Sequence, residues 1–268
     1  MWAVPCRDRP IVIFARKRFG QHFLHDARII GQILEALDPA PEDVLVEIGP
    51  GHGALTAPLL DRLGRLDAIE IDRDLAAELR EQWGSRGLTL YEDDALRFDF
   101  AALAVSRGRR LRVIGNLPYN VSTPLLFHLL RTPQALQDLH IMLQREVIQR
   151  LCAEPGSTDY GRLTVMLAPW VTTEYLFDVG PGAFRPPPKV WSAVARLTVR
   201  DVPAFATDER YAAVVAAAFS QRRKTLRNGL RAMLDAATIE SCGIDPGARP
   251  ETLAPEAFGR LAQAVATR

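Results

Sequence analysis

Five short apolar runs alternate with five amphipathic segments between residues 29 and 143, and this order limits the possible folds more than any other property of the chain. The runs have the composition of buried parallel strands, and the segments between them place apolar residues at helical spacing. We therefore expect strands at 44–48, 66–71, 88–91, 111–114 and 139–143, and helices at 29–37, 55–63, 75–83, 98–105 and 123–130. The alternation predicts an α/β fold with a parallel sheet, helices on both faces and ligands at the carboxyl ends of the strands.

The rest of the chain has a different pattern and predicts a second, smaller domain. Further strands are expected at 163–171, 174–177 and 190–199. Pro186, Pro187 and Pro188 indicate a stiff, extended segment. Residues 201–203 are typical of a linker, and alanine-rich patterns after it predict helices at 208–236 and 255–266. The expected organisation is a loose extension at 1–14, an α/β domain at 15–200 and a small all-helical domain at 204–268.

Composition limits the class of protein more than its activity. A chain of 268 residues with 48% hydrophobic residues can bury a substantial core. Its 33 basic and 32 acidic side chains leave a net charge of +1, so any binding of nucleic acid must depend on local basic patches. No run approaches the roughly 18 apolar residues of a membrane span, and the N-terminal segment lacks the apolar stretch of a secretory signal.

The cysteine and histidine positions argue against disulfides and metal sites. Cys6, Cys152 and Cys242 are far apart and include no C-x-x-C pair. The five histidines have no spacing that is typical of metal ligands. We therefore expect a cytoplasmic protein without a metal site.

A glycine-rich turn follows the first expected strand. Gly49, Gly51 and Gly53 would let a ligand approach the main chain closely, although three glycines alone could form nothing more than a tight turn. Glu70 closes the second expected strand about 20 residues further on, where a carboxylate can accept hydrogen bonds from both ribose hydroxyls of an adenosine. Together the two features predict a nucleoside-binding site.

Dinucleotide-dependent dehydrogenases share these two features, so other residues must distinguish the cofactor. Pro50 disrupts the helix-start amides that would hold a pyrophosphate. Glu47, at the end of the first strand, offers a carboxylate suited to an ammonium group. S-adenosylmethionine carries such an amine and no phosphate, so it is the expected cofactor. After the third strand, Asp94 could accept a hydrogen bond from the adenine amino group or simply cap the following helix.

The fourth expected strand leads into Asn116, Leu117, Pro118 and Tyr119, which we interpret as the catalytic turn. An aromatic amine such as adenine N6 is a weak nucleophile because its lone pair is delocalised into the ring. The Asn116 side-chain oxygen and the Leu117 carbonyl could accept both N–H bonds and aim that lone pair at a methyl group. Pro118 stiffens the turn, and Tyr119 offers a ring face to an extruded base. In isolation, these residues could also be an ordinary turn.

A basic segment in the C-terminal part is predicted to contact RNA phosphates. It holds five cations within ten residues and no acidic residue from 219 to 234: Arg222, Arg223, Lys224, Arg227 and Arg231. On a continuous helix, Lys224, Arg227 and Arg231 would share one face, next to an apolar face. A solvated helix would normally carry both signs of charge. Residues 16–18 and 107–112 are also basic and could extend the patch.

Four motifs in this order resemble the KsgA-type small-subunit ribosomal RNA adenine dimethyltransferases. The motifs occupy residues 16–24, 47–56, 116–119 and 184–190. The similarity extends from about residue 15 to the C-terminus and leaves residues 1–14 outside it. It implies a Rossmann-like S-adenosylmethionine-dependent methyltransferase domain, followed by a small helical domain that binds RNA.

The resemblance also implies a reaction and its site. Methyl groups would pass from S-adenosylmethionine to N6 of two adjacent adenosines in the loop near the 3' end of 16S rRNA, during biogenesis of the small subunit. The partner would be 16S rRNA in the immature subunit, and we expect a monomer. Carried over to this sequence, the target base would lie between Tyr119 and Phe184, and the cofactor site would comprise His22, Leu24, Gly49, Gly51, Glu70, Asp94 and Asn116. Many relatives have Asn at the position of His22, so the contact expected to persist there is one through the backbone.

Three alternatives remain open from the sequence. A related class of methyltransferases modifies large-subunit rRNA and confers antibiotic resistance, but the basic C-terminal segment and the proline-rich segment favour the small subunit. The protein could also act as an assembly factor that uses methylation as a release step. A dehydrogenase is the most distant alternative.

Overall fold

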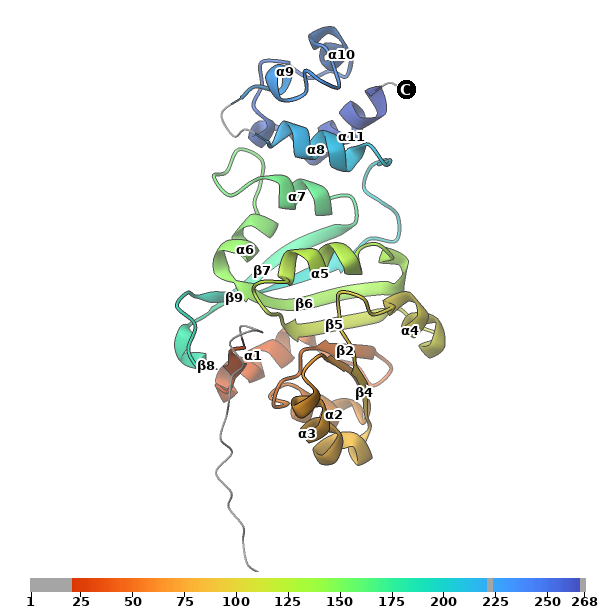
Figure 1. The fold of residues 1–268 in the computed structure, drawn as a ribbon, viewed down its shortest axis with the longest axis vertical. Helices are drawn as coiled ribbons and strands as arrows, with labels where there is room; N and C mark the ends of the chain where they lie inside the picture. The colour runs from red at the N-terminus through yellow and green to blue at the C-terminus, as the bar shows by residue number, and fades with distance from the viewer. Residues whose placement is uncertain (1–20, 221–223, 266–268) are drawn as a thin grey trace, which may run out of the picture.

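The computed structural model describes residues 21–220 and 224–265, and Figure 1 shows a sheet with its helices continued by a helical C-terminal part. The expected extension at 1–14, the basic residues 16–18, and Arg222 and Arg223 lie outside the described residues. The strands are β1 (Phe23–Leu24), β2 (Val44–Ile48), β3 (Leu66–Glu70), β4 (Leu88–Glu92), β5 (Leu111–Asn116), β6 (Leu136–Gln144), β7 (Val171–Val179), β8 (Phe184–Arg185) and β9 (Ser192–Val199). The helices are α1 (Ala27–Leu37), α2 (Thr56–Leu63), α3 (Arg73–Trp83), α4 (Phe100–Arg107), α5 (Ser122–Leu129), α6 (Arg145–Leu151), α7 (Arg162–Leu167), α8 (Tyr211–Ala218), α9 (Leu226–Gly229), α10 (Ala236–Ser241) and α11 (Pro255–Ala264).

Seven of the strands form one sheet in the order β4-β3-β2-β5-β6-β9-β7. The five strands from β4 to β6 are parallel, whereas β9 runs antiparallel to both β6 and β7. The strand order reverses between β2 and β5, and open sheets of this kind bind ligands at that point, beyond the carboxyl ends of the strands. The five predicted α/β units are confirmed, with boundaries that differ by a few residues.

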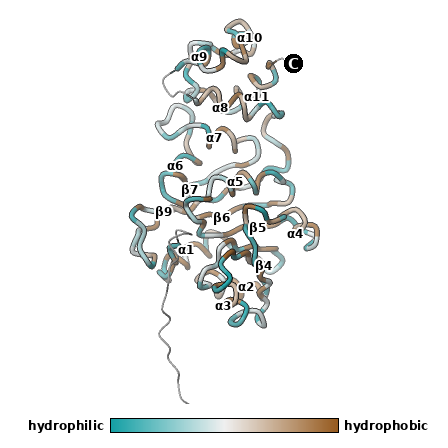
Figure 2. The backbone as a smooth tube through the Cα atoms, in the orientation of Figure 1, coloured by the Kyte–Doolittle hydropathy of each residue, from teal (hydrophilic) through white to brown (hydrophobic). Residues whose placement is uncertain are grey.

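The sheet is buried on both faces. Every residue of β2 and β3 is buried, including the carboxylates at the ends of these strands. One hydrophobic cluster contains Val46 and Leu126 on one face, and a second contains Leu45 and Leu59 on the other. Figure 2 shows hydrophobic stretches following the central strands. Polar groups on the central strands β2 and β3 are therefore shielded from water, whereas the edge strands β4 and β7 expose polar side chains such as Thr89 and Glu174.

The predicted strand at 163–171 is wrong, because most of this stretch forms helix α7. A short apolar run can fit a buried strand or a buried helix, and periodicity alone does not separate them. Here Val165 packs with the C-terminal helices, whereas Leu167 packs with the sheet. A helical turn can direct neighbouring apolar side chains into two different cores, and β7 begins only at Val171.

The predicted continuous helix at 208–236 is also wrong. Helix α8 ends at Ala218, and the four-residue helix α9 begins at Leu226. A Cβ atom on Gly229 would lie 3.3 Å from the carbonyl oxygen of Ala217, so α9 packs closely against the end of α8. The packing of α9 on α8 buries Leu226 and Leu230 completely. A continuous helix that projected from the protein would not bury them.

The helical part shares its core with the segment around α7. The Tyr160 hydroxyl donates to the Leu253 carbonyl at 2.7 Å, and the Tyr211 hydroxyl donates to the Val165 carbonyl at 2.7 Å. Tyr160 and Val165 belong to the same hydrophobic cluster as Phe258. The described part of the helical region, residues 204–220 and 224–265, is thus anchored on 160–167 and not only through the linker.

None of the described helices is long and apolar enough to cross a membrane. Among residues 21–220 and 224–265, no group of His, Cys, Asp and Glu side chains is arranged to hold a metal ion.

Candidate active site

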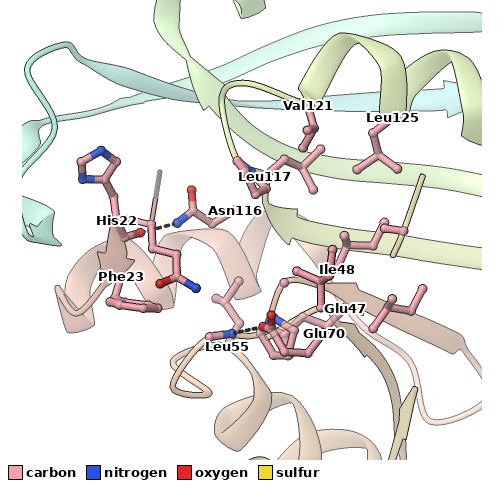
Figure 3. Close-up of a pocket in the computed structure, with 18 of the residues that line it drawn as sticks. His22, Phe23, Glu47, Ile48, Leu55, Glu70, Asn116, Leu117, Val121 and Leu125 are labelled. Carbon is pink, nitrogen blue, oxygen red and sulfur yellow. Dashed lines mark hydrogen bonds between the residues drawn. The ribbon is translucent and has the colours of Figure 1, made fainter. Parts of the chain in front are cut away.

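A cavity of about 370 Å³ lies at the carboxyl ends of β2, β3, β4 and β5. Its walls include the glycine turn after β2 and the turn after β5, two segments more than 60 residues apart in the sequence. Figure 3 shows Asn116 and His22 at one side of this cavity and Glu47 and Glu70 at another. The cavity opens where the strand order reverses between β2 and β5. The helices that follow these two strands, α2 and α5, begin on either side of this point.

The glycine turn depends on backbone conformations that favour glycine. Gly49, Gly51 and Gly53 have φ angles of 67°, 60° and 79°, all in the left-handed region. Gly49 and Gly51 line the cavity, whereas Gly53 packs on Trp83. The turn therefore exposes main chain to a ligand on one side and contacts α3 on the other.

Replacing Gly53 by alanine should lower the free energy of unfolding by about 3 kcal/mol, from overpacking and backbone strain together. A Cβ atom there would lie 2.2 Å from a ring carbon of Trp83, at a φ that L-residues rarely adopt. Gly64→Ala is the matched control, because its φ of 67° is similar but no atom lies within 4 Å of the added carbon. Urea denaturation of both variants measures the difference. Equal losses would mean that the Trp83 contact contributes nothing.

Glu70 is oriented by two backbone amides at the end of β3. Its Oε2 accepts a hydrogen bond from the Gly51 N–H at 3.2 Å, and its Oε1 accepts one from the Asp72 N–H at 2.9 Å. The side chain is 4% exposed, and this burial raises the pKa of its carboxyl group above the ordinary value. Each carboxylate oxygen can accept a second hydrogen bond, so the group suits a ligand with two neighbouring hydroxyls.

Glu47 lies deeper, at the end of β2. Its Oε2 accepts a hydrogen bond from the Thr56 hydroxyl at 2.6 Å, and both residues are buried. Loss of solvation raises the pKa of Glu47 to about 7, and the negative charge of Glu70 adds to the effect. A cationic ligand group beside Glu47 would favour its ionised form, which agrees with the ammonium that the sequence predicts there.

Glu47 should make the stability of the unliganded protein fall as pH rises. Its pKa is higher in the folded state than the ordinary 4.5, so the folded protein binds more protons between about pH 4.5 and 7. In that window the free energy of unfolding should drop, relative to Glu47→Gln, by up to about 1.4 kcal/mol per pH unit. Denaturant unfolding of both proteins at several pH values measures this slope. Parallel pH profiles would show that Glu47 is ionised throughout.

Asp94 does not cap the helix after β4, because the N-cap of α4 is Asp99, and its expected contact with the adenine amino group stays a prediction. Its Oδ1 accepts a hydrogen bond from the Leu96 N–H at 2.9 Å, which is a local turn contact. The residue also lines the cavity, next to Asp93 and Ala95. Since one oxygen is used locally, the other remains the candidate acceptor for a ligand amine.

The turn after β5 is held from both sides. The Asn116 amide nitrogen donates to the His22 carbonyl at 2.8 Å, shown as a dashed line in Figure 3, and this contact assigns the other end of the amide to the oxygen. The Tyr119 hydroxyl and the Ser192 hydroxyl are 2.7 Å apart, and burial raises the Tyr119 pKa above its ordinary value. Tyr119 is therefore anchored by its hydroxyl while its ring lines the cavity.

The helix after this turn begins differently from the prediction. The sequence predicts a helix from residue 123, but α5 begins at Ser122 and has no side-chain cap. The Ser122 hydroxyl instead donates to the Tyr119 carbonyl at 3.2 Å. This contact ties the start of α5 to the turn.

The structure brings His22 and Leu24 to the cavity but not Phe184. Leu24 and Phe184 pair in the two-stranded sheet β1-β8, and Phe184 is 2% exposed within the hydrophobic cluster that contains Leu24. Phe184 is not among the cavity residues, so in this structure its ring is not available to stack on a base beside Tyr119. Phe184 is paired with the cavity residue Leu24 through the backbone, but its side chain belongs to the hydrophobic core.

Several residues that line the cavity were not predicted from the sequence. Ile71 follows Glu70 and is 47% exposed, which leaves an apolar surface for a flat ligand. Phe23 packs on His52 with ring centroids 4.5 Å apart and lies against Gly51. Gln21, Leu96 and Val121 also line the cavity. A large apolar residue directly after a strand-end carboxylate was the only signal that could have indicated Ile71.

The basic residues divide into two groups. Lys224, Arg227 and Arg231 are exposed, and none forms an ion pair with a carboxylate of the described residues. By contrast, Arg107 and Arg112 are paired with aspartates of the sheet, at the edge opposite the cavity. Residues 107–112 therefore do not extend the basic patch, because they precede or begin a parallel strand.

The residues of the cavity fit S-adenosylmethionine. A bare glycine turn, a buried carboxylate with free acceptor positions and an exposed apolar residue suit the ribose and the purine, and Glu47 suits the amine. Together the fold and this cavity define a Rossmann-like, S-adenosylmethionine-dependent methyltransferase.

Comparisons with known proteins identify the family to which this methyltransferase belongs. The family model described as "Ribosomal RNA adenine dimethylase" matches residues 13–267. A protein of Nitrosococcus oceani named ribosomal RNA small subunit methyltransferase A is 56% identical over 91% of this chain and 93% of its own length. A protein of the same name from Pseudomonas fluorescens is 52% identical over 94% of both. The chain belongs to the ribosomal RNA adenine dimethylase family.

Solved structures agree with this assignment. A dimethyladenosine transferase from Plasmodium falciparum has the same fold, with a TM-score of 0.77, 24% identity, and coverage of 90% of this chain and 96% of that one. The 23S rRNA methyltransferase ErmE has a TM-score of 0.69 at 28% identity, over 91% of this chain and 99% of its own. The predicted fold class is thereby confirmed, and the family match and the named relatives confirm the predicted cofactor.

Proposed function

We propose that this protein transfers methyl groups from S-adenosylmethionine to N6 of two adjacent adenosines in the loop near the 3' end of 16S rRNA, and dimethylates each of them. The observation that carries the proposal is a single cavity that joins the glycine turn to the Asn116–Tyr119 turn. The names of relatives that are 51% to 56% identical support the small subunit as the source of the RNA.

In this proposal the chain's own residues bind and orient both reactants. When bound, S-adenosylmethionine supplies an electrophilic methyl group. Glu70 accepts hydrogen bonds from the ribose, and Asp94 accepts one from the adenine amino group of the cofactor. On the RNA side, the Asn116 amide oxygen and the Leu117 carbonyl accept the N–H bonds of the target amine, so that its lone pair is directed at the methyl carbon.

The target base is extruded from the RNA and held at the mouth of the cavity. Pro118 restricts the turn, and Tyr119 provides a ring face that the hydroxyl bond to Ser192 keeps in place. The aromatic stacking of one base contributes about 1 to 3 kcal/mol in nucleic-acid sites. We do not assign Phe184 a stacking role, since it is buried.

The proposal includes a setting for the reaction. The substrate is 16S rRNA within the immature small subunit, the enzyme acts as a monomer, and the reaction takes place in the cytoplasm. The exposed cations Lys224, Arg227 and Arg231 contact RNA phosphates, and Arg222 and Arg223 belong to the same basic segment of the sequence.

The direct test is to incubate unmethylated small subunits with labelled S-adenosylmethionine and to map the modified nucleotides. Label on two adjacent adenosines near the 3' end of 16S rRNA is expected. Large subunits are offered in parallel, because ErmE shares the fold. Label on 23S rRNA alone would contradict the proposal. Growth and subunit profiles of Glu70→Ala and deletion strains would separate catalysis from a role in assembly.

The exposed basic cluster should determine the salt dependence of RNA binding. Replacing Lys224, Arg227 and Arg231 together by alanine should weaken binding of small subunits and reduce the slope of log K against log salt by about two to three. The matched control replaces Arg65, Arg86 and Arg109. These residues are exposed and precede β3, β4 and β5, at the edge of the sheet opposite the cavity. Binding across a salt series measures both slopes. Equal slopes in the two variants would remove the cluster from the RNA-binding surface.

A further inference from the structure

Trp191 is a large aromatic residue that the proposed reaction does not yet use. It is 49% exposed and directly precedes Ser192, the first residue of β9, whose hydroxyl contacts the Tyr119 hydroxyl at 2.7 Å. Val190 beside it is 43% exposed. Tryptophan is enriched at binding interfaces, where its large ring offers apolar contact and its N–H can find a polar partner.

The topology places Trp191 at the cavity edge of the sheet. Strand β6 is parallel to β5 and ends at Gln144, which pairs with Ser192. Strand β7 ends at Val179, which also pairs with Ser192. Because β9 is antiparallel to both, its first residue lies at the same edge as Asn116, where β5 ends. Trp191 therefore lies at the carboxyl edge of the sheet, next to Ser192 and outside the set of residues that line the cavity.

The indole ring is held in place. The Arg145 guanidinium carbon lies 5.7 Å from the ring centroid, and the Arg145 N–H donates to the Trp191 carbonyl at 2.9 Å. The edge of the ring lies against Gly180, where a Cβ atom would be 3.6 Å from two ring carbons. A ring fixed on these sides loses little conformational entropy when a flat ligand stacks on it.

Arg145 places a positive charge beside the ring, and Arg185 and Lys189 lie earlier in the same segment of the chain. Arg185 and Lys189 are exposed, and neither forms an ion pair with a carboxylate of the described residues. The His22 Nδ1 atom lies 2.7 Å from the Pro186 carbonyl oxygen, which connects this segment to a cavity residue. Arg145 is ion-paired with Asp178, whose carboxylate lies 3.7 Å away and also accepts a hydrogen bond from the Tyr175 hydroxyl. We call Arg145, Arg185, Lys189, Val190 and Trp191 the rim platform.

We propose that the rim platform binds single-stranded RNA next to the target adenosine, with one flanking base stacked on Trp191 and its phosphates near Lys189 and Arg185. This inference rests on the proposed function and names a second base-binding position for the same reaction. A fixed aromatic surface with neighbouring cations is the combination that binds single-stranded nucleic acid without reading its sequence. The rim platform is connected to the catalytic turn through a single contact, between the hydroxyls of Ser192 and Tyr119.

The test uses Trp191→Ala and Trp191→Phe in the full-length protein. Trp191→Ala should raise the KM for unmethylated small subunits about 10-fold, the loss expected for one stacked base, while kcat and the dissociation constant of S-adenosylmethionine stay unchanged. Trp191→Phe keeps a ring and should remain within about threefold of the wild type in KM. Val105→Ala is the control, because Val105 is 82% exposed on α4 and away from the cavity residues.

Fluorescence provides a readout that a structural role of Trp191 would not change. Single-stranded oligoadenylate should quench the wild-type tryptophan emission, and Trp191→Phe should lose that quenching while it keeps most of the affinity. An unchanged KM for Trp191→Ala, or quenching that persists in Trp191→Phe, would overturn the inference. Weaker binding of intact subunits with unchanged binding of naked 16S rRNA would assign the platform to a protein partner instead. Failure of the proposed function is distinguished by wild-type protein that transfers no methyl groups to RNA at all.

Discussion

Asn116→Ala is expected to lower kcat about 10²- to 10³-fold, the loss seen when one preorganised polar group is removed from a reacting centre. The dissociation constant of S-adenosylmethionine should change by less than about threefold, because the lost oxygen acts mainly as the target nitrogen becomes pyramidal. The structure agrees with a larger effect on kcat than on cofactor binding. The amide nitrogen of Asn116 is used by the His22 carbonyl, and only the oxygen is left to face a substrate.

Asn120→Ala is the matched control for this experiment. Asn120 lies four residues further along the same turn, lines the same cavity and is exposed. We expect both kcat and cofactor binding of this variant to stay near the wild-type values. Single-turnover rates with unmethylated small subunits, together with calorimetric titration of the cofactor, give the two quantities. If Asn116→Ala reduced cofactor affinity as much as turnover, its main role would be to hold the His22 segment.

Glu70→Ala is expected to weaken the binding of S-adenosylmethionine about 10²- to 10³-fold, since two hydrogen bonds to a charged group are lost together. The change also releases the Gly51 and Asp72 amides, which the carboxylate holds at 3.2 Å and 2.9 Å. Gly51 lines the cavity, so the turn would lose order as well as an acceptor. Turnover at saturating cofactor should fall less than affinity.

Glu92→Ala separates this effect from a general loss of charge. Glu92 pairs with Glu70 in the sheet register and ends the neighbouring strand, but its carboxylate forms exposed ion pairs with Arg73 and Arg80. Exposed pairs of this kind contribute less than about 1 kcal/mol, so cofactor affinity should be nearly unchanged. Titrations with S-adenosylmethionine and with NAD measure affinity and specificity. Unchanged affinity in Glu70→Ala, or binding of NAD in place of S-adenosylmethionine, would refute the assigned role.

Local patterns in the sequence were sufficient to predict the ends of the strands that border the cavity. The runs that became β2, β3 and β5 are short, apolar and bounded by turn residues, so strand type and approximate limits followed from composition alone. Parallel strands put their carboxyl ends at one edge, and for that reason Glu70 and Asn116 could be assigned to one site without coordinates. The structure places both in the same cavity.

Other features depended on contacts between distant segments. Phe184 carries a recognisable motif, but whether its ring faces the cavity or the core is decided by β1, which pairs with it across 160 residues. The interruption between α8 and α9 is decided by the close packing of Gly229 on α8. No pattern within a window of 15 residues contains such information, because each choice is made by the surface that covers the segment.

The sequence by itself determined the α/β architecture, the cofactor and the two turns that line the cavity, after β2 and after β5. These features depend on periodicity, glycine positions and strand ends, which are local along the chain. Only the tertiary structure decided which side chains reach the cavity: it anchored Tyr119 on Ser192, buried Phe184, exposed Ile71 and brought Trp191 to the carboxyl edge of the sheet. The physical reason is that burial and hydrogen bonding of a side chain are set by whichever segments pack around it, and those segments come from parts of the chain that are far apart in the sequence.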